Sequence, residues 1–143
     1  MVSELRKEFD RYWSDRVPGL IEYTRYILDN DTDFNHTLRL LIRNISPETK
    51  ILDMGTGAGT VALELARMGH HVTAMDCNPD VIEAAKILAD EMKLDVDFIV
   101  GDVVDPDLPD QSFDVITARN CVWNLEDPMK AYSCWKKILK PGG

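Results

Sequence analysis

The chain has 143 residues, and its 16 Lys and Arg against 25 Asp and Glu give a net charge of −9. This length is that of one domain with a real core. The absence of any strongly basic stretch argues against a nucleic-acid or anionic-membrane surface, because phosphate binding needs clustered Lys and Arg. Met1 leads into a charged amphipathic stretch, with no signal peptide and no long apolar span, so we expect a cytoplasmic protein.

The first 47 residues are predicted to form three amphipathic helices, which we expect to act as an N-terminal lid domain (1–47). The first helix is predicted at residues 3–17, with Pro18 and Gly19 breaking it, and the second at residues 20–28. The third is expected to stop near Ser46. Its apolar face would carry Phe34, Leu38, Leu41, Ile42 and Ile45.

From residue 48 onward, short apolar runs alternate with helical periods, which is typical of βαβ units and a parallel sheet. Strands are predicted at residues 51–54, 71–75, 96–100 and 113–117, and a helix at 60–67. Asn78 and Asp127, each followed by proline, predict the N-caps of two further helices. The last helix is expected to turn Ala131, Tyr132, Trp135, Ile138 and Leu139 inward, and Trp123 is expected in the core.

The first predicted strand runs into an acid and then into alternate glycines, LDMGTGAG at residues 52–59. Glycine tolerates positive φ and lets the main chain approach a ligand closely. The pattern differs from the G-x-G-x-x-G of dinucleotide-binding proteins, because Thr60 stands where their third glycine would be. A ligand without a phosphate is therefore favoured.

Each of the four predicted strands ends in polar or small residues. These are Asp53 with Gly55, Thr56 and Gly57 after the first, Asp76 and Cys77 after the second, Asp102 and Val103 after the third, and Arg119, Asn120 and Cys121 after the fourth. Taken singly, such an acid is as often a turn residue as a ligand contact. Together they predict one pocket at the carboxyl edge of the sheet, whose acids suit a cationic ligand and would repel a pyrophosphate.

This arrangement resembles the class I S-adenosylmethionine-dependent methyltransferases. The resemblance implies a Rossmann-like three-layer α-β-α fold with a mainly parallel sheet in the order 3-2-1-4. It implies that Asp76 binds both ribose hydroxyls, that Cys77, Asp102 and Val103 contact the adenine, and that Asp53, Gly55 and Arg119 hold the methionine end of the cofactor. Residues 48–143 would then be the S-adenosylmethionine-binding domain.

The resemblance further implies in-line methyl transfer to a small-molecule acceptor, with S-adenosylhomocysteine as the product. No catalytic residue is assigned, and no metal is expected because His36, His70 and His71 lack metal-ligand spacing. Tyr12, Trp13, Arg16 and Tyr23 are candidates to cover the methyl group, although a core or surface position is the commoner fate of such residues.

Three other functions remain open at this point. One is a nicotinamide-dependent oxidoreductase, one is a binding or assembly module without catalysis, and one is an aminopropyl transferase. The family's domain continues beyond a turn like that of residues 139–143, so we expect a truncated chain. Its fourth strand would then be an exposed edge, through which two copies could form a homodimer.

Overall fold

The computed structural model describes residues 4–143 as an α/β fold around a four-stranded parallel sheet in the order β3-β2-β1-β4. The strands are β1 (Lys50–Met54), β2 (His71–Asp76), β3 (Asp97–Val100) and β4 (Val115–Ala118). In the register of the central strand, Asp53 lies between Ala74 of β2 and Thr117 of β4. The predicted fold class and strand order are confirmed.

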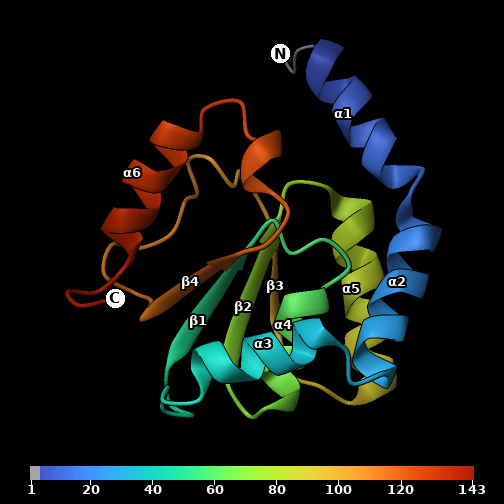
Figure 1. The fold of residues 1–143 in the computed structure, drawn as a ribbon. Helices are drawn as coiled ribbons and strands as arrows, with labels where there is room; N and C mark the ends of the chain where they lie inside the picture. The colour runs from blue at the N-terminus through green and yellow to red at the C-terminus, as the bar shows by residue number, and fades with distance from the viewer. Residues whose placement is uncertain (1–3) are drawn as a thin grey trace.

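Alternate residues of β1 enter two different cores, one on each face of the sheet. Ile51 packs in a cluster with residues of α3 (Asp33–Ile42) and α4 (Thr60–Arg67). Leu52 and Met54 pack on the other face against α6 (Pro128–Ile138), where Trp135 is 5% exposed. Both faces of the sheet are covered, as a parallel sheet requires (Figure 1).

The capping signals of the sequence are confirmed. The Asn78 side chain accepts hydrogen bonds from the N–H groups of Asp80 and Val81 at the start of α5 (Pro79–Met92). Asp127 accepts from the N–H of Lys130 at the start of α6. Pro79 and Pro128 lie in the first turns, where a missing N–H costs nothing.

The predicted break at Pro18 and Gly19 is wrong. The first two helices are α1 (Glu4–Ser14) and α2 (Val17–Asp29), so the chain turns at residues 15–16 and Pro18 lies in the first turn of α2. Proline disrupts the interior of a helix but is favourable in its first turn, so Pro18 marks the start of a helix here and not the end of one. The expected helix start at residue 3 lies outside the described residues.

Three further expectations need correction. The helix α3 ends at Ile42 rather than near Ser46, and Leu41 is 74% exposed. The strand β4 begins at Val115, because Phe113 instead forms an isolated parallel bridge with Leu139. Trp123, in the short 3-10 helix η1 (Val122–Asn124), is 76% exposed instead of buried.

Two smaller points concern the helices. Tyr132 of α6 is 49% exposed and does not turn inward, although Ala131 and Ile138 do. Within residues 4–143, none of the helices has the length and apolar character needed to cross a lipid bilayer. The expected boundary between a lid at 1–47 and a domain at 48–143 stays a prediction. Leu38 and Ile42 of α3 share a core with Ile51 of β1, so α3 packs directly on the sheet.

Candidate functional site

A cleft of about 850 Å³ opens at the carboxyl ends of the four strands. All ten residues that the sequence predicted as cofactor contacts line it: Asp53, Gly55, Thr56, Gly57, Asp76, Cys77, Asp102, Val103, Arg119 and Asn120. Parallel strands bring their carboxyl ends to one edge of the sheet, which is why residues 67 positions apart in the chain share one wall. Their roles toward a ligand stay predictions.

The glycine loop between β1 and α4 depends on positive φ at three positions. Gly55, Gly57 and Gly59 have φ of +63°, +58° and +87°. A Cβ on Gly55 would lie 2.4 Å from the Cβ of Cys121, so the loops that follow β1 and β4 are in close contact at this point. A Cβ on Gly57 would meet no atom within 4 Å, so the main chain there borders open space in the cleft.

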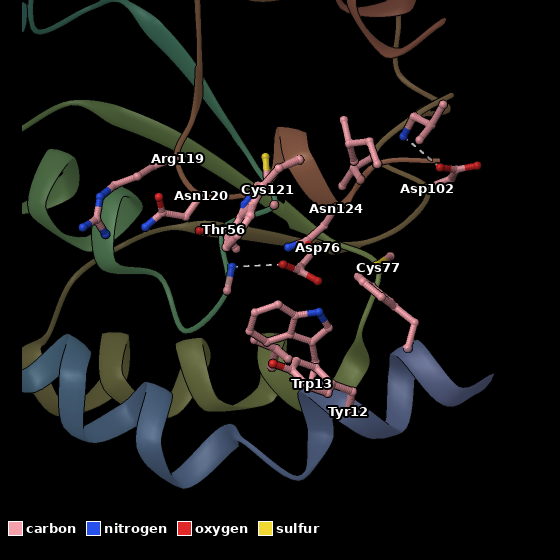
Figure 2. Close-up of a pocket in the computed structure, with 18 of the residues that line it drawn as sticks. Tyr12, Trp13, Thr56, Asp76, Cys77, Asp102, Arg119, Asn120, Cys121 and Asn124 are labelled. Atoms are coloured by element: carbon pink, nitrogen blue, oxygen red, sulfur yellow. Dashed lines mark hydrogen bonds between the residues drawn. The ribbon is translucent and has the colours of Figure 1, made fainter. Parts of the chain in front are cut away.

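Asp76 ties the end of β2 to the glycine loop. One carboxylate oxygen accepts a hydrogen bond from the N–H of Gly57 at 3.0 Å (Figure 2). The other accepts from the N–H of Asn78 at 3.0 Å. Burial raises the pKa of Asp76 above its ordinary value, and the two main-chain donors oppose that shift. Each oxygen keeps a second lone pair, which suits two hydroxyl donors on one ligand.

Asp53 is a buried carboxylate with one unsatisfied oxygen. The Thr117 hydroxyl donates to its Oδ1 at 2.7 Å, while its Oδ2 and the neighbouring Thr56 hydroxyl have no hydrogen-bond partner. Burial raises the pKa of Asp53 to about 6, the Thr117 hydrogen bond opposes this shift, and the charge of Asp76 adds to it. A cation placed in the cleft would stabilise the ionised form.

After the third strand, one carboxylate oxygen of Asp102 is used in a turn. Asp102 accepts from the N–H of Val104 at 2.8 Å, which is the turn role that the sequence had left open (Figure 2). The carbonyl of Val103 accepts from the Trp135 indole at 2.7 Å, so its N–H is the main-chain group left for a ligand edge. One oxygen of Asp102 remains available as well.

Arg119 is directed toward the N-terminal helices. Its guanidinium donates to the Tyr23 hydroxyl at 2.8 Å and lies 4.4 Å from the centre of the Phe34 ring. In Figure 2 the side chain points away from Asp76. Asn120 has a φ of +56°, which asparagine tolerates better than most residues, and it turns the chain so that Cys121 can contact Gly55.

The two thiols of the cleft are poor nucleophiles. Burial, with the charge of Asp76 second, raises the pKa of Cys77 to about 11. Burial, followed by the charges of Asp53 and Asp76, also raises the pKa of Cys121 to about 11. Both remain protonated near neutral pH, so the cleft offers positioning and electrostatics rather than a thiolate.

The outer wall comes from α1 and η1. Tyr12, Trp13 and Tyr23 line the cleft, and Figure 2 shows Tyr12 and Trp13 on the α1 side, opposite the glycine loop. Arg16, the fourth candidate for covering the methyl group, instead packs 3.4 Å from the centre of the Tyr12 ring.

Sequence reasoning missed several lining residues that no motif marks: Leu5, Arg6, Glu8, Phe9, Trp123, Asn124, Glu126 and Lys130. Among the described residues, no group of three or more His, Cys, Asp or Glu side chains could hold a metal ion.

A parallel 3-2-1-4 sheet with an open glycine loop after β1 and a partly buried acid ending β2 matches the class I, Rossmann-like methyltransferase fold. The sequence profile of a family described as "Methyltransferase domain" matches residues 52–143, and the chain belongs to this family of S-adenosylmethionine-dependent enzymes.

Individual relatives agree with this assignment. A "Ubiquinone biosynthesis O-methyltransferase" of Xanthomonas campestris is 33% identical over 99 residues, which are 68% of this chain and 41% of the relative. The chain therefore spans less than half the length of that curated relative. Among solved structures, a SAM dependent methyltransferase from Aquifex aeolicus shares the fold with a TM-score of 0.72 and 22% identity, over 90% of this chain and 68% of its own.

One solved neighbour has a different activity in its name. The [4+2]-cyclase SpnF aligns with a TM-score of 0.71 and 27% identity, over 76% of this chain and 42% of its own. The fold alone therefore does not define the reaction.

The glycine loop gives a first prediction. Gly55→Ala should destabilise the chain more than Gly57→Ala, by about 2 kcal/mol or more. Both substitutions place alanine at a positive φ that it adopts poorly, but only the first also creates a clash with Cys121. Urea denaturation followed by circular dichroism measures both. Equal losses would show that the contact with Cys121 relaxes freely.

The buried Asp53 gives a second prediction. Its folded pKa of about 6 lies above its unfolded value, so its contribution to stability is greatest below about pH 4 and is lost as the pH rises through 6. Asp53→Asn has no carboxyl group to ionise, so the variant does not lose stability in this way as the pH rises. The free energy of unfolding of Asp53→Asn minus that of the wild type should therefore rise by up to about 3 kcal/mol between pH 4 and pH 7. A difference that is flat or falls with pH contradicts the assignment.

Proposed function

We propose that the cleft binds S-adenosylmethionine and that the protein transfers its methyl group to a small-molecule acceptor, releasing S-adenosylhomocysteine. The observation that carries this proposal is the pair of carboxylates, the buried Asp53 and the partly buried Asp76, at neighbouring strand ends beside a glycine loop open to the cleft. The ligand has a sulfonium, an ammonium and a ribose diol, which match buried acids with lone pairs to spare.

The residues present fit this cofactor. Asp76 would accept the two ribose hydroxyls, and the unsatisfied Oδ2 of Asp53 would face the ammonium end. Cys77, with Asp102 and the N–H of Val103, would border the adenine. Gly55, Thr56 and Gly57 would let the main chain approach the methionine part, with Asn120 at the same end. Arg119 would act through its main chain, since its side chain is engaged by Tyr23.

The cofactor supplies the electrophilic methyl group, and the protein has to align the acceptor and exclude water. Tyr12 and Trp13 of α1 and Trp123 of η1 give the cleft flat apolar faces on the outer wall. Such faces suit a planar aromatic acceptor, and the similarity to an enzyme named for ubiquinone biosynthesis supports the same choice. No side chain of the cleft is assigned as a general base.

The second candidate is a protein that binds the cofactor without transferring a methyl group. It is favoured by one observation, the likeness to a protein named as a [4+2]-cyclase. A nicotinamide-dependent oxidoreductase is disfavoured by the acids of the cleft, because a pyrophosphate would face Asp53 and Asp76.

The cytoplasmic location and the homodimer also stay proposals. The free edge of β4 borders a shallow cavity of about 350 Å³, lined by Ile116, Ala118, Val122, Tyr132 and Leu139 among others. An exposed strand edge beside an apolar hollow is a template for pairing with another chain. Sedimentation velocity would measure the oligomeric state directly.

Calorimetric titration tests the ligand. The chain should bind S-adenosylmethionine saturably and show no response to NAD. Asp76→Asn should weaken the binding by about 10- to 100-fold, because it removes one charged acceptor from the ribose hydroxyls.

Asp114→Asn is the matched control, since Asp114 also accepts from a main-chain N–H, that of Lys50, but at the opposite end of the sheet. This variant should bind like the wild type. Binding of NAD in place of S-adenosylmethionine would overturn the proposal, and so would equal effects of the two substitutions. Binding without turnover of any phenolic acceptor would favour the second candidate.

A further inference from the structure

Asn78 uses every one of its polar groups, although it is only 1% exposed. Its side-chain oxygen accepts from the N–H groups of Asp80 and Val81, which caps α5. Its main-chain N–H donates to Asp76 at 3.0 Å. Its side-chain amide donates to the Asp10 carbonyl at 2.8 Å and to the Ser14 hydroxyl at 3.1 Å, both in α1. A helix cap needs only the first pair of these bonds.

The helix α1 lies at the surface of the fold. None of its residues 4–14 is buried, and Figure 1 shows it extending from α2 away from the sheet. Six of its residues nevertheless line the cleft: Leu5, Arg6, Glu8, Phe9, Tyr12 and Trp13. None of these side chains is fully buried, and the buried amide of Asn78 contributes two hydrogen bonds to the placement of α1 over the cleft.

We propose that Asn78 is a positioning residue that couples Asp76 to α1, so that a ligand on Asp76 and the placement of α1 over the cleft stabilise each other. The proposal rests on the proposed function in one respect, since it takes Asp76 as the group that holds the ribose hydroxyls. The path is short: the carboxylate of Asp76 accepts from the main-chain N–H of Asn78, and the side-chain amide of the same residue donates to the last turn of α1.

The coupling has to work in both directions. A ligand that binds Asp76 fixes the carboxylate, and through it the position of Asn78, which lowers the cost of keeping α1 in place. Because coupling free energies are reciprocal, loosening α1 must weaken the ligand by the same factor. The hydrophobic cover of the cleft by Tyr12 and Trp13 would then depend on whether the cofactor is present.

Asn78→Ser separates the cap from the coupling. Serine caps a helix about as well as asparagine, but its shorter side chain has no amide to reach α1. In hydrogen exchange by mass spectrometry, the ligand-free variant should show faster exchange of residues 4–14, with the first turn of α5 unchanged. S-adenosylhomocysteine should slow the exchange of residues 4–14 in the wild type and have little effect on them in the variant.

The affinity for S-adenosylhomocysteine should fall by about five- to tenfold in Asn78→Ser, measured by calorimetry. Ser14→Ala, which removes only one acceptor on the α1 side, should give a smaller effect of the same kind. The double variant should be no weaker than Asn78→Ser alone, because both changes break one connection. A purely structural role of Asn78 would instead speed exchange in α5 and give additive effects.

The two proposals fail in different ways. If the wild type does not bind S-adenosylhomocysteine, the proposed function is wrong and the coupling is overturned with it. If the wild type binds but Asn78→Ser leaves the affinity and the exchange of residues 4–14 unchanged, the coupling alone is wrong. Faster exchange in α1 without any loss of affinity would also overturn it, since reciprocity would be violated.

Discussion

The carboxylate of Asp76 is the interaction on which the rest of the site depends. It stands at the end of β2 and accepts from Gly57 on one side and from Asn78 on the other. The glycine loop and the start of α5 are thereby fixed relative to one strand end. A partly buried acid is costly unless its lone pairs are used, and two main-chain donors offset only part of that cost. Each oxygen keeps a further lone pair that can accept a hydrogen bond.

A second constraint holds the loops after β1 and β4 together. Gly55 and Cys121 approach so closely that no side chain larger than hydrogen fits at the first position. The Cys121 thiol also donates to the carbonyl of Met54 at 3.2 Å. Asp53, next to this contact, is buried with one oxygen unsatisfied, which is a cost that folding alone does not explain. Burial raises the pKa of Asp53, and acids with a raised pKa concentrate at functional sites.

The helices α1 and α2 are attached to the site through polar contacts rather than through a shared core alone. Arg119, at the end of β4, contacts Tyr23 of α2 and the ring of Phe34 in α3. Asn78 contacts α1. Arg119 immediately follows β4, and Asn78 lies two positions after the end of β2. The geometry of the cleft and that of its cover are therefore set by the same short segments.

The sequence by itself determined the strands, the glycine loop and the caps at Asn78 and Asp127, because these follow from local periodicity, φ requirements and hydrogen bonds between near neighbours. The strand order was implied by the family resemblance and not by any local pattern. The sequence also predicted which strand-end residues would meet, since a parallel sheet gathers them at one edge. Only the tertiary structure decided that Trp123 is exposed, that Arg119 turns to Tyr23, and that the amide of Asn78 reaches α1. These contacts join residues up to 96 positions apart, and no local pattern encodes which of several possible partners a side chain finds once the layers have packed.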